Sequence, residues 1–328
     1  MIAAVISGHF KSGVLPNGRS TSCFGRTRGR RGGAVRSANQ LGRSRAQRTI
    51  RNFASPRCSL QGVAAPIMVG KSTQRADMQI ELDQTVDWHG MPLDTVRHIA
   101  ATVLRVLNRP IMKPGKKPAD PWPLKIVITN GTPPPMVLTR PGDTANIRVA
   151  VAGHYPIQFC YQFSHERGHV LSNHWQYYKP GPFHWLEESI CGSLSLVALK
   201  DAQTSWAKSG DTVLCNLASK IPQYLQDVEE SECPLSIADV PQWFLTNDQA
   251  LRLMHSLQKL NGRLSALLSD KFRASPFLIR SLQARNRWPA PDNSLDEHLR
   301  NWTAQCNAIG VPSALPNELA RLFGVLIS

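Results

Sequence analysis

The stretch Gln162-Phe-Ser-His165-Glu166-Arg167-Gly168-His169-Val-Leu171 is the most informative part of this 328-residue chain. Residues four apart lie on one face of a helix, so the imidazoles of His165 and His169 can reach one metal ion. Zinc favours such nitrogen ligands in tetrahedral geometry. Glu166 is rotated about 100° around the helix from His165, where it can reach a metal-bound water without binding the metal. The motif therefore predicts a zinc site with an adjacent general base.

Two protein ligands are too few for zinc, so a third is expected elsewhere in the chain. A third histidine in a His-x-x-Gly-x-x-His arrangement is excluded, because Ser172 and Trp175 occupy the required positions. A carboxylate on a second helix fits better. Glu187 and Glu188 follow the break Lys179-Pro-Gly-Pro182, which allows the next helix to return antiparallel. An ordinary acidic first turn, favoured by the helix dipole, explains one of these two carboxylates equally well.

The paired motifs resemble those of the gluzincin metallopeptidases, which include thermolysin-like enzymes and zinc aminopeptidases. The aminopeptidase pattern places a ligand Glu, within Trp-Leu-Asn-Glu, 18 residues after the second histidine, and this chain has Trp185-Leu-Glu-Glu188 at that spacing. The resemblance covers about residues 124–200 and extends to uncharacterised bacterial proteins with a Glu-Glu-x-x-Cys segment. It implies one Zn²⁺ ion bound by His165, His169 and Glu188, with Glu166 as the catalytic base of a peptidase.

Two departures from that family pattern limit what the resemblance implies. The Gly-x-Met-Glu-Asn segment that binds a free amino terminus is absent, since the corresponding strand reads Ile147-Arg-Val-Ala-Val-Ala-Gly153. The Asp found four residues after the ligand Glu in thermolysin-like enzymes is Gly192 here. Exopeptidase specificity is therefore not supported, and the histidine ligands need other supporting groups. Candidates for stabilising an oxyanion are four residues, none of them preferred: Tyr177, Tyr178, Tyr224 and His255.

The charge of the chain is concentrated in its first 76 residues. Of the 38 Lys and Arg, 14 lie there with no acidic residue, which leaves 24 basic against 23 acidic residues from Asp77 onward. Such an Arg-, Gly- and Ser-rich segment buries too little apolar surface to fold. We interpret it as a disordered tail, which can be a nucleic-acid or membrane-surface arm, a targeting segment, or sequence upstream of a true start at Met68 or Met78.

Apolar periodicity predicts an α+β fold for the remainder. Strands are expected at 78–83, 124–129, 136–139 and 146–152, and a helix capped by Asp94 at 94–108. Further helices are expected at 156–174, 184–200, 212–227 and 247–270. This describes a small mixed sheet packed on a zinc-binding helix pair, as in a thermolysin-like catalytic domain. We expect a metallopeptidase-like core over 77–210 and a helical C-terminal part over 211–328.

The predicted function is a zinc-dependent hydrolase, a peptidase that uses zinc-activated water with Glu166 as general base. Its partner would be a peptide or protein substrate, bound as an extra strand beside residues 146–152. Seven scattered cysteines without a C-x-x-C pair favour a reducing, cytoplasmic compartment, and no apolar run is long enough to span a membrane. The alternatives are a non-catalytic metallopeptidase-like binding protein and a nucleic-acid-associated protein acting through residues 1–76.

Overall fold

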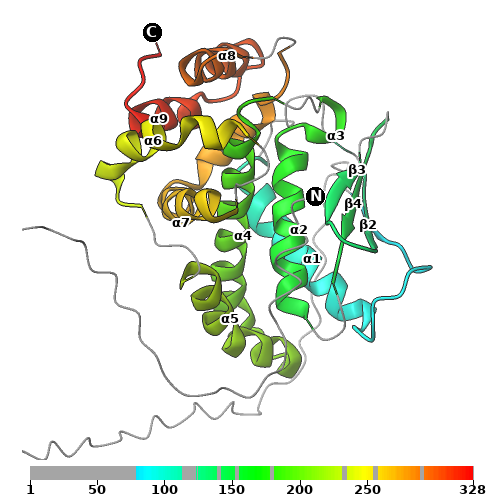
Figure 1. Ribbon diagram of the computed structural model, residues 1–328. Helices are drawn as coiled ribbons and strands as arrows, with labels where there is room; N and C mark the ends of the chain where they lie inside the picture. The colour runs from blue at the N-terminus through cyan, green and yellow to red at the C-terminus, as the bar shows by residue number, and fades with distance from the viewer. Residues whose placement is uncertain are drawn as a thin grey trace, which may run out of the picture. The chain divides into compact units, whose positions relative to one another are not determined.

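The computed structural model describes residues 79–112, 123, 125–138, 142–151, 155–177, 181–230, 235–253, 258–288 and 292–327 (Figure 1). These residues all belong to one of the two units into which the chain divides. The predicted tail and the alternative starts at Met68 and Met78 lie outside the described residues. None of the described helices is long and apolar enough to cross a membrane.

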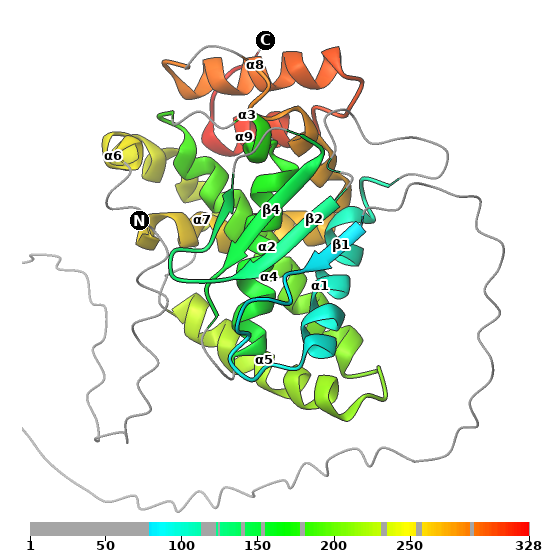
Figure 2. The same ribbon diagram turned by 90° about the vertical axis from the view of Figure 1, so that its right-hand side faces the viewer.

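A four-stranded mixed sheet lies on one side of the helices (Figures 1 and 2). Its strands are β1 (Gln79–Leu82), β2 (Lys125–Asn130), β3 (Met136–Leu138) and β4 (Thr144–Val149), in the order β1-β2-β4-β3. β1, β2 and β4 run parallel, whereas β3 pairs antiparallel with β4. Burial alternates along β2 and β4, so one face of the sheet packs on the helices. The predicted small mixed sheet is confirmed.

The expected substrate-binding role of residues 146–152 is wrong in one respect. β4 ends at Val149 and pairs with β2 on one side and β3 on the other. The backbone of Ala150 is then bonded to the Gln162 side chain, and that of Val151 to Asn130. β4 is therefore an interior strand, and β3 forms that edge of the sheet within the described residues.

Helix α1 (Leu93–Asn108) covers the sheet with a single apolar stripe. The buried positions of this stripe are Val96, Ile99, Ala100, Val103, Leu104 and Leu107. The predicted helix is confirmed, but Asp94 is not its N-cap. The cap position is Pro92, and Asp94 lies in the first turn, where its carboxylate accepts a hydrogen bond from Arg97.

Helices α2 (Pro156–Leu171) and α4 (His184–Trp206) lie at the centre of the described unit and are buried on nearly all sides. The helix expected over 156–174 ends at Leu171, because Asn173 adopts the left-handed conformation with φ of 61°. A separate short helix, α3 (His174–Tyr177), follows. The helix expected over 184–200 continues for six more residues, to Trp206.

The C-terminal part is helical, as expected, and packs around α4. Its elements are α5 (Thr212–Glu230), η1 (Ile237–Asp239), α6 (Val240–Arg252), α7 (Gln258–Ala274), η2 (Pro276–Ala284), α8 (Leu295–Ala308) and α9 (Ala314–Phe323). The prediction of one helix over 247–270 is wrong. Leu253 is extended, with φ of −90° and ψ of 97°, so α6 and α7 are separate helices.

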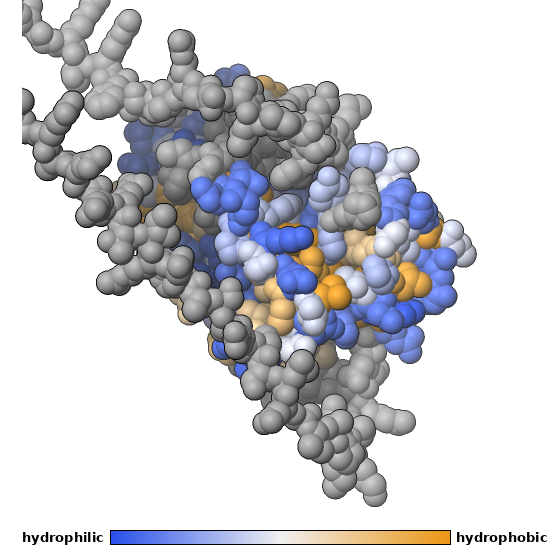
Figure 3. Space-filling view, turned by 90° about the horizontal axis from the view of Figure 1, so that it is seen from below, coloured by the Kyte–Doolittle hydropathy of each residue, from blue (hydrophilic) through white to orange (hydrophobic). Residues whose placement is uncertain are grey.

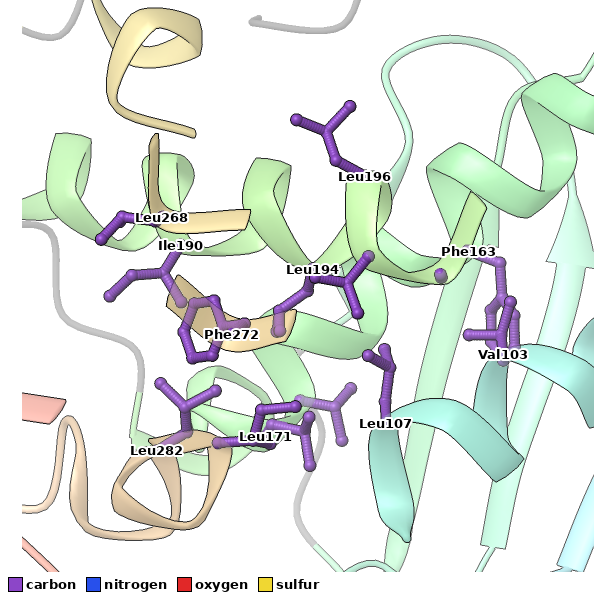
Figure 4. Close-up of a cluster of buried hydrophobic side chains, with 14 of the residues drawn as sticks. Val103, Leu107, Phe163, Leu171, Ile190, Leu194, Leu196, Leu268, Phe272 and Leu282 are labelled. Atoms are coloured by element: carbon purple, nitrogen blue, oxygen red, sulfur yellow. The ribbon is translucent and has the colours of Figure 1, made fainter. Parts of the chain in front are cut away.

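One hydrophobic core joins these layers. Figure 4 shows Leu107 and Val103 of α1 near Phe163 and Leu171 of α2, while Ile190, Leu194, Leu268 and Phe272 lie between α4 and α7. On the face of the molecule seen in Figure 3, polar and apolar side chains are interspersed. The fold is thus a mixed α+β arrangement in which the sheet covers α1 and α2, and the C-terminal helices cover α4.

Candidate metal centre

The candidate centre lies between α2 and α4, which run antiparallel to each other. The hydroxyl of Ser195 donates to the carbonyl of Tyr161 near one end of the contact, and His169 meets Glu187 near the other. Residue numbers therefore rise along α2 as they fall along α4. This is the arrangement that the Lys179–Pro182 break predicts.

Close approach of the two helices depends on Gly168, within the motif itself. A Cβ at Gly168 would lie 2.8 Å from Cys191 Sγ and 3.1 Å from Cys191 Cα. Side chains larger than glycine would separate the helices and move the motif away from α4. Cys191 and Cys160 are both fully buried, as expected for small core residues, and the four described cysteines are free thiols.

Two buried polar side chains fix α2 against the sheet and α1. Gln162 accepts from the amide of Ala150 at 2.8 Å and donates to its carbonyl at 3.0 Å, which ties α2 to the end of β4. Arg167, fully buried inside the motif, donates to Asn108 Oδ1 at the end of α1 at 2.8 Å. Burial lowers the pKa of Arg167 to about 9, so its guanidinium remains charged at neutral pH.

The three predicted ligands converge. His165 Nε2 lies 3.1 Å from Glu188 Oε2, and His169 Nε2 lies 3.3 Å from Glu188 Oε1. One donor atom from each of the three residues lies within 4.8 Å of the others. The side chains of His165 and Glu188 are 21% and 12% exposed, against 6% for His169, so solvent reaches the cluster from the His165 side.

This donor set fits a zinc ion. Two ligand atoms about 2.1 Å from a tetrahedral zinc lie about 3.4 Å apart. The nitrogen-to-oxygen distances of 3.1 and 3.3 Å are close to that separation. Two imidazole nitrogens and one carboxylate are also a ligand set that zinc enzymes use, with a position left for water or substrate. The residues present therefore match the group that the motif implies.

Glu187 and Glu188 occupy opposite sides of the His169 ring. Glu188 faces the Nε2 atom, whereas Glu187 Oε1 lies 2.7 Å from Nδ1. Glu187 also accepts from Arg285 and from Asn286, and lies 3.1 Å from His174 Nδ1. A carboxylate on Nδ1 fixes the tautomer that leaves Nε2 for a metal. The structure thus brings Glu188 to the ligand position and gives Glu187 a supporting contact.

His184 joins the cluster from the first turn of α4. Its Nε2 atom lies 2.9 Å from Glu188 Oε1, and its side chain is 9% exposed. The sequence suggested only that His184 caps a helix, although its i, i+4 spacing from Glu188 is the same signal that relates His165 to His169. His174 was also missed, because it follows the motif on a separate short helix. His154 lies outside the described residues.

Glu166 is buried beside the ligands and faces the edge strand. Burial raises the pKa of its carboxyl, and Glu188 adds to this effect. The nearby His169 and His165 act in the opposite direction, as does a hydrogen bond from the Val137 amide of β3. Its position beside the ligands, close to β3, is the one expected of a group that exchanges protons with water at the centre.

The two glutamates of α4 are held ionised despite their burial. Burial alone raises the pKa of Glu187, but hydrogen bonds from His169 and His174 and the charge of Arg285 bring it well below its ordinary value. Burial opposes ionisation of Glu188 too, and His169, His165 and His184 overcome it, so its pKa is also well below the usual range. Burial likewise lowers the pKa of His169, but Cys191, Glu188 and Glu187 raise it overall. The centre therefore concentrates negative charge, which favours a cation.

Neither tyrosine that the structure describes among the oxyanion candidates joins this cluster. Tyr224 lies on α5 with its ring 6.1 Å from Tyr161 and its hydroxyl buried, which raises its pKa. Tyr177 is 41% exposed on α3, so the packing role expected of it is wrong, whereas the expected packing of Trp175, 1% exposed, is confirmed. Tyr178 and His255 lie outside the described residues.

Comparison of the chain with protein-family models, with curated proteins and with solved structures yields no match. The functional assignment therefore depends on the residues of the centre and their geometry.

Proposed function

We propose that the chain is a zinc-dependent hydrolase of the gluzincin type, with a thermolysin-like arrangement of its catalytic helices. His165, His169 and Glu188 would bind one zinc ion. The observation that carries this proposal is the convergence of their three donor atoms within 4.8 Å, from two antiparallel helices. A bound zinc ion would polarise a substrate carbonyl and make a bound water more acidic, bringing its pKa toward ~7.

The residues around the centre supply the remaining requirements of hydrolysis. Glu166 takes a proton from the attacking water and returns it to the leaving amine. Glu187 holds His169 through Nδ1 at 2.7 Å. The low exposure of Glu166, 5%, limits competition from bulk water around the reacting atoms.

A peptide is the substrate class that the surroundings favour. β3 has a free outer edge within the described residues, and its Val137 amide faces Glu166. An extended peptide bound along this edge would bring its backbone carbonyls past Glu166 and the ligands. The interior strand β4 cannot serve this purpose, because both of its sides are paired.

Zinc content separates the ligand assignment from its alternatives. The full-length protein should hold about one zinc per chain, as measured by elemental analysis after dialysis. His165→Ala and Glu188→Ala should each lose it, whereas His89→Ala, at an exposed histidine before α1, should retain it. Zinc retained by Glu188→Ala would contradict the ligand set.

Glu166→Gln tests catalysis without removing a ligand. It should keep the zinc and lower the rate of cleavage of a fluorogenic peptide library by about 10²- to 10⁴-fold, the usual contribution of a positioned general base. A variant as active as the parent would exclude Glu166 as the base. A zinc-loaded parent that cleaves no peptide would favour the non-catalytic binding protein. The nucleic-acid alternative concerns residues 1–76, which lie outside the described residues.

A further inference from the structure

A buried polar chain leads from the C-terminal helices to the far side of the proposed metal centre. Its members are Asp292, His298, Arg285 and Glu187, which are 6%, 5%, 1% and 2% exposed. They come from the segment before α8, from α8, from the segment after η2, and from α4. Charged side chains are rarely buried unless each is paired, so four such residues in succession need an explanation.

Each link of this chain is a direct contact. His298 Nδ1 lies 2.5 Å from Asp292 Oδ2, and His298 Nε2 lies 3.2 Å from Arg285 Nη1. Arg285 Nε donates to Glu187 Oε2 at 3.2 Å, and the other oxygen of Glu187 lies 2.7 Å from His169 Nδ1. The sequence of contacts therefore ends on the ring of a proposed zinc ligand.

The donor and acceptor roles along the chain are fixed by arginine. A guanidinium only donates, so His298 Nε2 must accept from Arg285, and His298 Nδ1 then carries the proton that Asp292 accepts. Burial, together with the charge of Arg285, lowers the pKa of His298 to about 4, although Asp292 acts against this. His298 is thus neutral at neutral pH and has one tautomer.

The same segment is fastened to the end of the motif helix. Asn173 donates to the carbonyls of Gln283 and Arg285, at 2.9 and 2.8 Å. Asn286 is in the left-handed conformation, with φ of 63°, and donates to Ser172 O and to Glu187 Oε2. The turn at residues 285–286 therefore links the end of α2 to Glu187.

We propose that Asp292, His298 and Arg285 are positioning residues, which orient Glu187 and through it His169, so that the C-terminal helices set the affinity of the centre for zinc. This inference rests on the proposed function. It goes beyond it, because it assigns part of the metal centre to residues 285–298, more than 90 positions after the last ligand.

The test measures the zinc affinity of the full-length protein by competition with a chromophoric chelator. His298→Leu removes the acceptor of Arg285 and should weaken zinc binding by about tenfold, the lower end of what partners beyond the ligands contribute. His298→Gln provides an amide oxygen that can accept from Arg285, so it should recover most of the affinity. Asp292→Asn, a gentler change, should weaken binding less than His298→Leu and serves if that variant fails to fold.

Ser281→Ala is the matched control. Ser281 is fully buried in η2 and bonds Pro312 O and the Leu315 amide, so its loss destabilises the C-terminal helices outside the polar chain. It should leave zinc affinity unchanged. Equal affinity of His298→Leu and the parent, or equal weakening in Ser281→Ala, would overturn the inference while leaving the ligand assignment intact. A parent protein that binds no zinc would overturn both.

Discussion

Helices α1 and α4 differ in how many of their sides are buried. α1 buries one apolar stripe and exposes its polar face, which carries Arg97 and Asp94. α4 is buried on all sides, and small residues such as Gly192 and Ser189 allow its neighbours to approach closely. The difference shows where a site can form. A helix with one buried face contributes to the core, whereas α4 meets partners from α2, α7 and the 285–286 turn and can hold charged side chains among them.

The largest effect is expected from the aromatic cluster that covers one side of α4. Trp185 is 1% exposed and contacts the rings of Trp243, Phe244 and Phe323. Trp185→Ala should lower the free energy of unfolding by about 3–5 kcal/mol, because it leaves a large cavity. Urea denaturation followed by circular dichroism measures this. A loss below about 1 kcal/mol would show that α6 and α9 do not stabilise α4 as we describe.

A pH-dependent effect is expected from the polar chain on another side of α4. The pKa of His298 falls from 6.5 to about 4 through burial, so the unfolded chain binds a proton that the native protein does not. The stability that this neutral histidine contributes is complete above pH 6.5 and is lost as the pH falls through about 4. The total loss is on the order of 3 kcal/mol.

Urea denaturation of the parent and of His298→Gln between pH 7 and pH 4 should isolate this contribution. The parent should lose more stability than the variant over this range, because glutamine does not titrate. Parallel pH profiles would contradict the depressed pKa of His298.

A smaller effect is expected where α7 crosses α4. A Cβ at Gly192 would lie 2.6 Å from Ser265 Oγ, so Gly192→Ala should destabilise the protein by about 1–3 kcal/mol despite the higher helix propensity of alanine. Ser265→Ala removes the obstructing oxygen, and the double variant should recover part of the loss. Strict additivity of the two changes in a thermal denaturation series would rule out this contact. The same contact explains why no aspartate occupies position 192.

The smallest effect is expected on the exposed face of α1. Arg97 pairs with Asp94, but the two side chains are 51% and 88% exposed. Arg97→Ala should change the free energy of unfolding by no more than about 0.5 kcal/mol. A loss of 2 kcal/mol or more in the same urea assay would mean that α1 is not the one-sided helix that its burial indicates.

Much of the fold could be predicted from local pattern. The stripe from Val96 to Leu107 predicted α1 almost to the residue, and alternation predicted the strands. Errors arose where local pattern is ambiguous. The periodicity from 247 to 270 continues across Leu253, whose extended conformation separates α6 from α7. Which strand would lie at the sheet edge was also not visible, since pairing order depends on contacts between distant segments.

The sequence by itself determined the candidate ligands, because His165, His169 and Glu188 are related by helical spacing and by a fixed interval along the chain. Only the tertiary structure decided which glutamate faces which nitrogen of His169, and only it brought His184 onto Glu188 and Arg285 onto Glu187. Spacing within a helix is set by local backbone geometry and can be read from residue numbers. Contacts between α2, α4 and residues 285–298 depend on how the buried helices pack, which no local pattern encodes.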